Sequence, residues 1–374
     1  MRPLIIPFFI PHAGCPHTCL FCNQHMISGA QQSVPSARQI SETVQQWLGR
    51  SPNRAAEVAF YGGSFTLLPR KQQEQLLEAV QPLLEQQKIR NIRISTRPDA
   101  LDEAVLAFLA GHKVTTIEVG VQSLDDLVLL QSNRGHTAAD SMAAIQRVRS
   151  AGFQVGAQLL PGLPGDTRAK ALASVQGVIA AGAQFVRIYP AVVLSGTALA
   201  DQYRAGHYQP PDLAQGVKNC ARMLHLCLQA GIPVIRIGLQ AEEGLSAEGA
   251  ILAGCWHPAL GQLVKAQLYH DLVLTLAEHF KSFDGLQLAC PPDRLSEVQG
   301  HARSNLQRWQ QAGLPVDRIL TDPGLNHDQI CLQNLQQKSI GSIITTDIYK
   351  ESLNAQGITG FSGKAAGRPQ PLWL

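Results

Sequence analysis

Short apolar runs alternate with longer segments of mixed polarity over the first two thirds of the chain. The runs are rich in β-branched and aromatic residues, and the longer segments repeat their apolar positions with the period of a helix. Strands are predicted at residues 5–10, 58–61, 92–96, 116–120, 155–160, 185–189 and 234–237. Helices are predicted between them, at residues 35–48, 69–87, 101–110, 138–151, 168–181 and 213–230.

This alternation predicts an α/β fold in which helices cover a parallel sheet. Its six or so repeats favour a partial or full parallel (β/α) barrel of the TIM type over residues 1–240. In such a barrel the active site is built from the loops at the C-terminal ends of the strands. We therefore expect the functional residues directly after the predicted strands.

The last third of the chain divides into two further predicted pieces. Residues 241–283 are predicted to extend the barrel and to hold a connecting helix at 262–280. Residues 284–374 are predicted to form a small α/β domain whose tail, from residue 360, is extended. Its strands are expected at 286–289, 318–321 and 329–332, and its helices at 292–298 and 304–311.

Between these last two helices lies Gly300-His301-Ala302-Arg303. The segment resembles the G-x-x-G loop with which KH modules clamp a nucleotide backbone. Arg303 stands where the second glycine would be, and the final segment is not clearly basic. A KH-like RNA-binding domain and a small packing domain therefore both remain open.

Three cysteines follow the first predicted strand with the spacing C-x3-C-x2-C, at Cys15, Cys19 and Cys22. Three thiolates on one loop can hold three irons of a [4Fe–4S] cluster. No fourth cysteine lies on this loop, so one iron would keep an open position, as catalytic metal centres do. The alternative is a zinc site completed by a nearby histidine; the candidates are His12, His17 and His25.

Composition narrows the class of protein without naming a substrate. The chain has 374 residues, 45% hydrophobic and 16% charged, and a net charge of +3 that is too small to argue for nucleic acid. The other five cysteines have no metal-ligand spacing and are expected to be buried thiols in a reducing compartment. No apolar stretch is long enough to span a bilayer. A soluble, cytoplasmic protein is expected.

Polar or glycine-rich signatures follow nearly every predicted strand. The second strand leads to a Gly-Gly-Ser turn at 62–64, and the third to Ser95-Thr96-Arg97. Strand alternation places Glu118, Gly120 and Gln122 on one face of the fourth. Any one signature is weak evidence, but their joint placement at strand ends predicts a single site.

Together these motifs resemble the radical S-adenosylmethionine (radical SAM) superfamily. The cysteine loop has an aromatic residue, Phe21, before its last cysteine, and the Gly-Gly-Ser turn is similar to the superfamily's motif for the methionine amino group. More narrowly, the segments look like the radical domain of the Elongator catalytic subunit, in the same order over residues 5–240. These segments are 61–66, 96–99, 118–123, 133–137, 161–165, 188–190 and 194–197.

The resemblance implies two cofactors, a [4Fe–4S] cluster and S-adenosyl-L-methionine (SAM). Reductive cleavage of SAM would give a 5′-deoxyadenosyl radical that abstracts hydrogen from a substrate, with the electron coming from a carrier such as flavodoxin or ferredoxin. The motif positions imply cluster ligation by Cys15, Cys19 and Cys22 and cofactor binding by Phe21, Gly62, Gly63, Ser64, Arg97 and Glu118. Glu118 and Gln122 are also catalytic candidates. The alternative for Arg97, Glu118 and Gln122 is a satisfied ion pair inside the barrel.

The resemblance also implies an RNA substrate, most closely tRNA. The chain departs from the Elongator-like proteins after residue 240, where no acetyl-CoA loop or acetyltransferase domain is recognisable. Two alternatives therefore remain. The substrate is a peptide or small metabolite instead of RNA, or the chain is a zinc-stabilised RNA-binding protein without catalysis. His257, next to Cys255 and Trp256, is a third catalytic candidate if its segment returns to the barrel mouth, although such pairs are more often structural.

Overall fold

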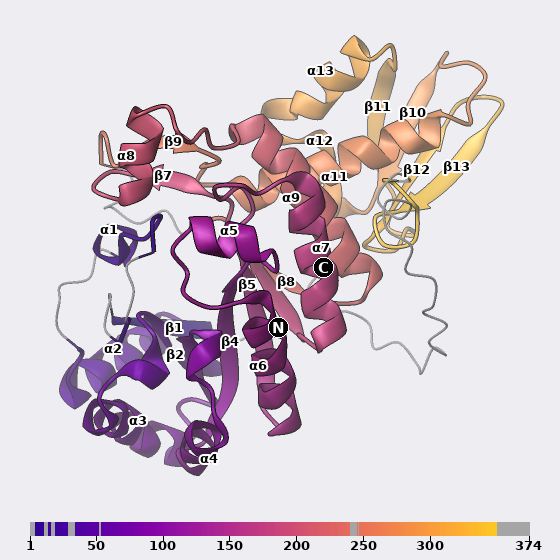
Figure 1. Ribbon diagram of the computed structural model, residues 1–374. Coiled ribbons are helices and arrows are strands. Elements are labelled where there is room, and N and C mark those ends of the chain that lie inside the picture. The colour runs from indigo at the N-terminus through magenta and orange to yellow at the C-terminus, as the bar shows by residue number, and fades with distance from the viewer. Residues whose placement is uncertain are drawn as a thin grey trace. The chain divides into compact units, whose positions relative to one another are not determined.

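Figure 1 shows the computed structural model, which describes residues 4–10, 14–15, 19–28, 34–51, 54–239, 245 and 247–349. The predicted tail, His12, His17 and the side chain of His25 lie outside the described residues. The chain forms two compact units, one of residues 1–216 and 232–258 and the other of 217–231 and 259–374. The three-part division expected from the sequence stays a prediction.

The first unit is built on a seven-stranded sheet whose neighbouring strands are all parallel. The order follows the sequence, and the sheet curls into a half-barrel of the kind predicted. All seven predicted strands are confirmed. They are β1 (Leu4–Ile10), β2 (Ala56–Gly62), β3 (Asn91–Thr96), β4 (Val114–Gln122), β5 (Gln154–Leu159), β6 (Phe185–Ile188) and β8 (Val234–Ile237).

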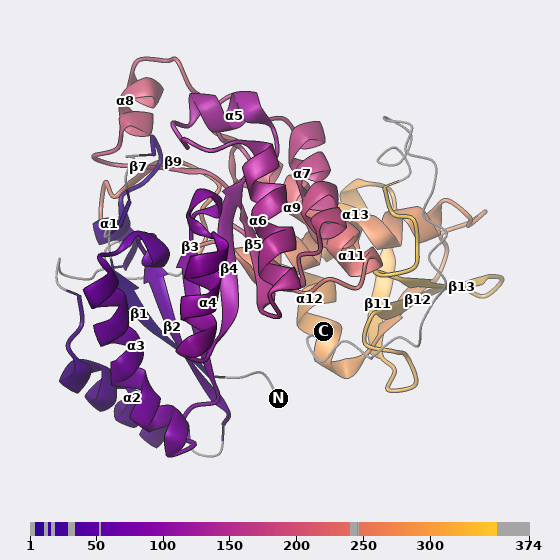
Figure 2. The same ribbon diagram turned by 60° about the horizontal axis from the view of Figure 1, so that its bottom comes forward.

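Helices cover the outer face of this sheet (Figures 1 and 2). They are α2 (Ala37–Arg50), α3 (Arg70–Glu85), α4 (Glu103–Gly111), α6 (Ala138–Ser150) and α7 (Arg168–Ala181), and α9 (Leu213–Gln229) follows. Ser36 and Thr137 cap α2 and α6 with reciprocal capping boxes, and Thr167 caps α7. The six predicted helices therefore begin and end within a few residues of their predicted bounds.

Strand β1 forms one edge of the half-barrel and carries Pro7 at its centre. Proline has no N–H to donate, so within sheets it is confined to edges, strand starts and bulges. The side chains of β1 alternate between buried and half-buried positions, because one face of the strand packs against the helices and the other faces the inside of the half-barrel. Ile5, Pro7 and Phe9 are the inward residues.

Several short elements in the first unit are absent from the predicted set. They are α1 (Gln24–Ser28), α5 (Asp126–Gln131), α8 (Ala198–Arg204) and the antiparallel pair β7 (Val192–Leu194) and β9 (Ile251–Gly254). Elements this short carry too few periods to be recognised. The partners β7 and β9 are far apart in sequence, so their pairing depends on the tertiary fold.

Among its described residues, the second unit contains a four-stranded sheet in the order β11-β10-β12-β13, helices α11, α12 and α13, and most of α9. Strand β10 is parallel to β11 and antiparallel to β12, which is antiparallel to β13. Trp309 and Tyr269 are among its largest fully buried side chains. The bounds are α11 (Leu260–Ala277), β10 (Leu286–Cys290), α12 (Leu295–Gln299), α13 (Ser304–Gln311), β11 (Val316–Thr321), β12 (Gln329–Gln333) and β13 (Lys338–Ser342).

The glycine-containing loop of this unit connects α12 to α13, as predicted. Gly300, Ala302 and Arg303 all have positive φ, so the turn is tight even without a second glycine. The KH-like character of the loop stays a prediction. Short 3-10 helices lie at Phe65–Leu67, Pro98–Ala100, Pro292–Arg294 and His301–Arg303. None of the described helices combines the length and apolarity that a membrane crossing requires.

Candidate functional site

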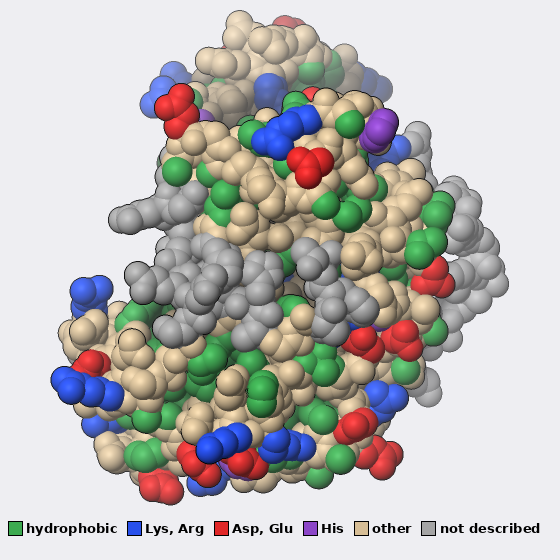
Figure 3. All heavy atoms as spheres, turned by 60° about the vertical axis from the view of Figure 1, so that its left-hand side comes forward, with side chains coloured by type: hydrophobic (Ala, Val, Ile, Leu, Met, Phe, Trp, Pro, Cys, Tyr) green, Lys and Arg blue, Asp and Glu red, His purple; other side chains and the backbone are tan. Residues whose placement is uncertain are grey.

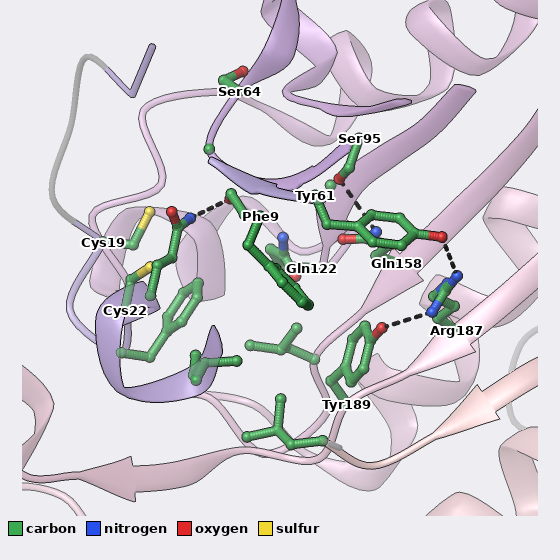
Figure 4. A pocket seen from close by; sticks show the side chains of 18 of the residues that line it. Phe9, Cys19, Cys22, Tyr61, Ser64, Ser95, Gln122, Gln158, Arg187 and Tyr189 are labelled. Atoms are coloured by element: carbon green, nitrogen blue, oxygen red, sulfur yellow. Dashed lines mark hydrogen bonds between the residues drawn. The ribbon is translucent and has the colours of Figure 1, made fainter. Parts of the chain in front are cut away.

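A cavity of about 500 Å³ lies inside the half-barrel and is lined by residues of the first unit (Figure 4). Every strand of the sheet contributes to its wall, and the loops after β1, β2, β3 and β6 close its upper part. The carboxyl ends of these strands meet at one edge of the sheet, which is where this class of fold places chemistry. The site predicted at the strand ends is therefore one continuous cavity.

The three cysteines after β1 all line this cavity. Their loop is anchored from both sides: the Leu20 N–H donates to the Ser132 carbonyl (3.2 Å), and the Leu199 N–H donates to the Leu20 carbonyl (2.8 Å). The Cys22 N–H closes a turn on the Cys19 carbonyl (3.1 Å). Helices α5 and α8 thus hold the loop from its flanks.

The donor set of the cavity fits an iron–sulfur cluster with one open iron. Burial, together with mutual repulsion, raises the pKa of the Cys15 thiol and raises that of Cys22 to about 12. Three thiolates therefore need a cation to coexist here. The described lining offers these three sulfurs and no histidine or carboxylate as a fourth ligand.

The three cysteines line the cavity without forming the ligand group of a single metal ion. Among the described residues, no three side chains of the ligand types stand at metal-binding distance from a common centre. A cubane cluster is itself several ångströms across and binds each cysteine at a different iron. Spread sulfurs thus suit a cluster better than a single zinc ion.

The Gly-Gly-Ser turn after β2 packs against the end of β1. Gly62 has a φ of +102°, and a Cβ there would lie 3.3 Å from the backbone of Ile10. The Gly63 N–H donates to the Ile10 carbonyl (2.9 Å), and the Gln24 side chain donates to the Gly62 carbonyl. Ser64 Oγ accepts from the Arg97 N–H (3.1 Å). All three turn residues line the cavity, beside the cysteines.

Two arginines stand next to this turn. Arg97 binds Asp99 with two hydrogen bonds (2.9 and 2.7 Å) and donates to the carbonyl of Arg134 (2.8 Å). Arg134 donates to the sulfur of Cys19 (3.3 Å) and to the carbonyl of Gly120 (2.6 Å). Arg134 is a site residue that was not singled out from the sequence, although it lies inside the matching segment 133–137.

Gln122 lines the cavity at the end of β4, where the strand bulges. Its φ is +69°, and its buried Oε1 has no hydrogen-bond partner among the described residues. A buried acceptor without a partner is costly unless a ligand satisfies it. Its placement supports a role toward a bound molecule, which stays a prediction.

Glu118 lies behind the cavity wall rather than on it. It is fully buried, and its carboxylate is 3.0 Å from Arg93 and 2.7 Å from Arg187. Tyr61 and Gln158 also donate to it (3.0 and 2.8 Å). Burial opposes its ionisation, but the two arginines outweigh burial and lower its pKa. These contacts favour the ion-pair alternative over a cofactor-binding or catalytic role.

The hydrogen bonds and ion pairs around Glu118 extend to the cavity through Arg187. Its guanidinium donates to the hydroxyls of Tyr61 (2.6 Å) and Tyr189 (3.2 Å), as Figure 4 shows. Both tyrosines line the cavity, with Phe9 between them and the cysteines. The part of the cavity away from the cysteines is therefore walled by aromatic rings.

The remaining candidates divide between the cavity and the rest of the unit. Phe21 lines the cavity and packs against Val128, Leu163 and Ala191. His257 is half-buried and is not among the residues that line the cavity. Its proposed catalytic role stays a prediction without geometric support.

Gly14 gives a test of the cysteine loop. Its φ is +72°, and an added Cβ would lie 2.4 Å from the Ser64 carbonyl oxygen. Gly14→Ala should therefore displace the loop and lower the iron bound per chain after reconstitution by at least half. Gly111→Ala is the matched control, because no atom lies within 4 Å of its Cβ. Equal iron contents would contradict this role of Gly14.

Comparisons with known proteins agree with this geometry. Residues 9–176 match the family model of the radical SAM superfamily, and residues 183–270 match that of the Radical_SAM C-terminal domain. Protein YhcC of Escherichia coli is 28% identical over 55% of this chain and 66% of its own length. A tRNA uridine(34) acetyltransferase of Methanocaldococcus infernus is 30% identical over 36% of this chain and 26% of its own length.

The structure of Elp3 from Methanocaldococcus infernus shares the fold, with a TM-score of 0.56 at 20% identity. The match covers 71% of this chain and 62% of that one. The chain thus spans about two thirds of the length of these two relatives and about a quarter of the acetyltransferase. The two family models match consecutive parts of the chain. The half-barrel and the three cysteines in its cavity agree with these matches. The chain belongs to the radical SAM superfamily, whose cofactors are a [4Fe–4S] cluster and SAM.

Proposed function

We propose that the chain is a radical SAM enzyme that modifies RNA, with tRNA as its substrate. The observation that carries this proposal is the wall of the cavity away from the cysteines. There Phe9, Tyr61 and Tyr189 present rings beside the guanidinium of Arg187. Proteins bind unstacked RNA bases by stacking them on aromatic rings and arginine planes. The tRNA uridine acetyltransferase among the relatives supports the same substrate class.

The residues near the cysteines would hold the two cofactors. Cys15, Cys19 and Cys22 would bind the cluster, and the Gly-Gly-Ser turn would face the methionine end of SAM. When bound, these cofactors supply a carbon-centred radical able to abstract hydrogen from an unactivated carbon. The chain's own part is to orient the substrate carbon and to keep water out, to which the half-buried apolar side chains of Phe21 and Leu160 contribute.

The open side of the half-barrel suits a large substrate. Strands β1 and β8 are the two ends of the sheet, and residues of both line the cavity. A nucleotide that projects from a folded RNA can thus enter while the rest of the RNA stays outside. The acetyl-transfer chemistry of the relative is not part of this proposal, because no acetyl-CoA loop is recognisable in the chain.

The described residues in Figure 3 form no large basic patch on this face. Lys and Arg side chains alternate there with Asp and Glu. Non-specific attraction to a polyanion needs a cluster of one sign. On this face, recognition would therefore depend on the cavity rather than on a broad electrostatic field.

The nucleoside content of tRNA tests the proposal. Total tRNA from a strain that lacks the gene should miss one modified nucleoside, and the gene restored on a plasmid should return it. A Cys19→Ser gene should fail to restore it, because the cluster is lost. If the deletion leaves every tRNA nucleoside unchanged while the purified enzyme still cleaves SAM, the RNA substrate is wrong. A metabolite or peptide, the alternative from the sequence, would then be the substrate class.

A further inference from the structure

Arg236 is a cavity residue that neither the cofactors nor the ion-pair network accounts for. It lies on β8, the last strand of the half-barrel, directly beside Arg187 of β6 in the strand register. Its side chain is half-buried and lines the cavity. Its Nε donates to the Gly238 carbonyl (3.2 Å), which fixes the guanidinium and leaves its two terminal nitrogens for other partners.

The other cavity arginines have identified partners. Arg187 is paired with Glu118, Arg97 is paired with Asp99, and Arg134 donates to the sulfur of Cys19. No acidic residue within the described ranges forms an ion pair with Arg236. Among the residues that the structure describes, Arg236 therefore has no anionic partner, although it lines the cavity. A guanidinium in this position suits an anionic ligand, with which it would form charge-assisted hydrogen bonds.

Arg236 and the cysteine loop come from opposite ends of the strand order. The cysteines follow β1, at one end of the strand order, and Arg236 belongs to β8, at the other end. The hydroxyls of Tyr61 and Tyr189, in the aromatic wall, accept hydrogen bonds from Arg187, which is the neighbour of Arg236. An anion held at Arg236 would therefore adjoin the rings on which a base could stack.

We propose that Arg236 binds a phosphate of the RNA next to the nucleotide that enters the cavity. This inference rests on the proposed function and names the group that positions the substrate. A guanidinium presents two parallel N–H groups that match two phosphate oxygens, which an ammonium cannot reproduce. Phosphate contacts fix the register of a nucleic acid, so Arg236 determines which carbon faces the radical.

Small nucleotides measure this contact directly. The full chain, reconstituted with its cluster, is titrated with nucleoside 5′-monophosphates and with the corresponding nucleosides. The wild type should bind at least one monophosphate about tenfold or more tightly than its nucleoside. Arg236→Gln should abolish that difference, and Arg236→Lys should restore only part of it. Arg90→Gln, which removes an exposed arginine, should leave the difference unchanged.

Turnover on bulk tRNA from the deletion strain gives the second readout. Arg236→Gln should raise the KM for tRNA at least fivefold, whereas the control Arg90→Gln should leave it unchanged. If the wild type modifies tRNA and Arg236→Gln keeps its KM and its monophosphate preference, the inference is overturned. It is likewise overturned if Arg236→Gln weakens binding of a small dicarboxylate such as malonate but not of the monophosphates. If the wild type modifies no tRNA, the proposed function fails instead.

Discussion

Replacing Cys15, Cys19 or Cys22 with serine should each abolish cluster assembly and SAM cleavage. The wild type should bind about four irons per chain after anaerobic reconstitution. Each variant should bind less than about a quarter of that, because the cavity offers no substitute ligand among its described lining residues. Loss of outer-shell partners alone costs metal sites 10–100-fold in activity. Loss of a ligand should therefore lower 5′-deoxyadenosine release by more than about a hundredfold.

The matched control is Cys331→Ser. Cys331 is a buried cysteine of β12, in the second unit. Its variant should keep the iron content and the absorption of the wild type. If one of the three loop variants retains both the iron content and the rate of SAM cleavage, the cysteine replaced in it is not a cluster ligand. A colourless protein that binds one zinc would instead favour the zinc-site alternative.

Arg187→Met should give the largest loss of stability among single substitutions in the network. It leaves the Glu118 carboxylate fully buried, with Arg93 as its one remaining cationic partner among the described residues. Removing one partner of a buried ion pair costs about 3–5 kcal/mol of unfolding free energy. Urea unfolding followed by circular dichroism measures the loss, and the variant's midpoint should fall accordingly.

A double variant separates charge from packing. In Glu118→Gln with Arg187→Met the uncompensated charge is gone, so the double variant should recover at least half of the lost stability. Tyr61→Phe, which removes one hydroxyl from the same network, should cost only about 1 kcal/mol. Equal stabilities of the single and the double variant would show that Glu118 is not the group destabilised by the loss of Arg187.

The strands of the half-barrel were predictable because most of the side chains in the central strands are buried. Such strands read as short apolar runs, and all seven appear in the sequence. The pair of β7 and β9 was not predictable, because each strand is short and is completed by a partner distant in sequence. The same limit applies to the anchoring of the cysteine loop by Ser132 and Leu199.

The candidate site was predictable as a set of residue types, but not in its detailed roles. Strict alternation puts Glu118, Gly120 and Gln122 on one face, whereas β4 carries one extra residue between Val119 and Gln122 relative to β5. Such a bulge re-aims the side chains after it. Gln122 thus reaches the cavity, while Glu118 is enclosed by Arg93 of β3 and Arg187 of β6. Only the tertiary structure brings those arginines together.

Pro7 also affects the tendency of this protein to aggregate at high concentration. A half-barrel that stays open exposes two strand edges, and exposed edges invite pairing between molecules that ends in aggregates. Proline on an edge strand and charged side chains that point inward both discourage such pairing. This chain has Pro7 on one outermost strand and Arg236 on the other. The features that keep the entrance accessible would thus also discourage the molecules from polymerising.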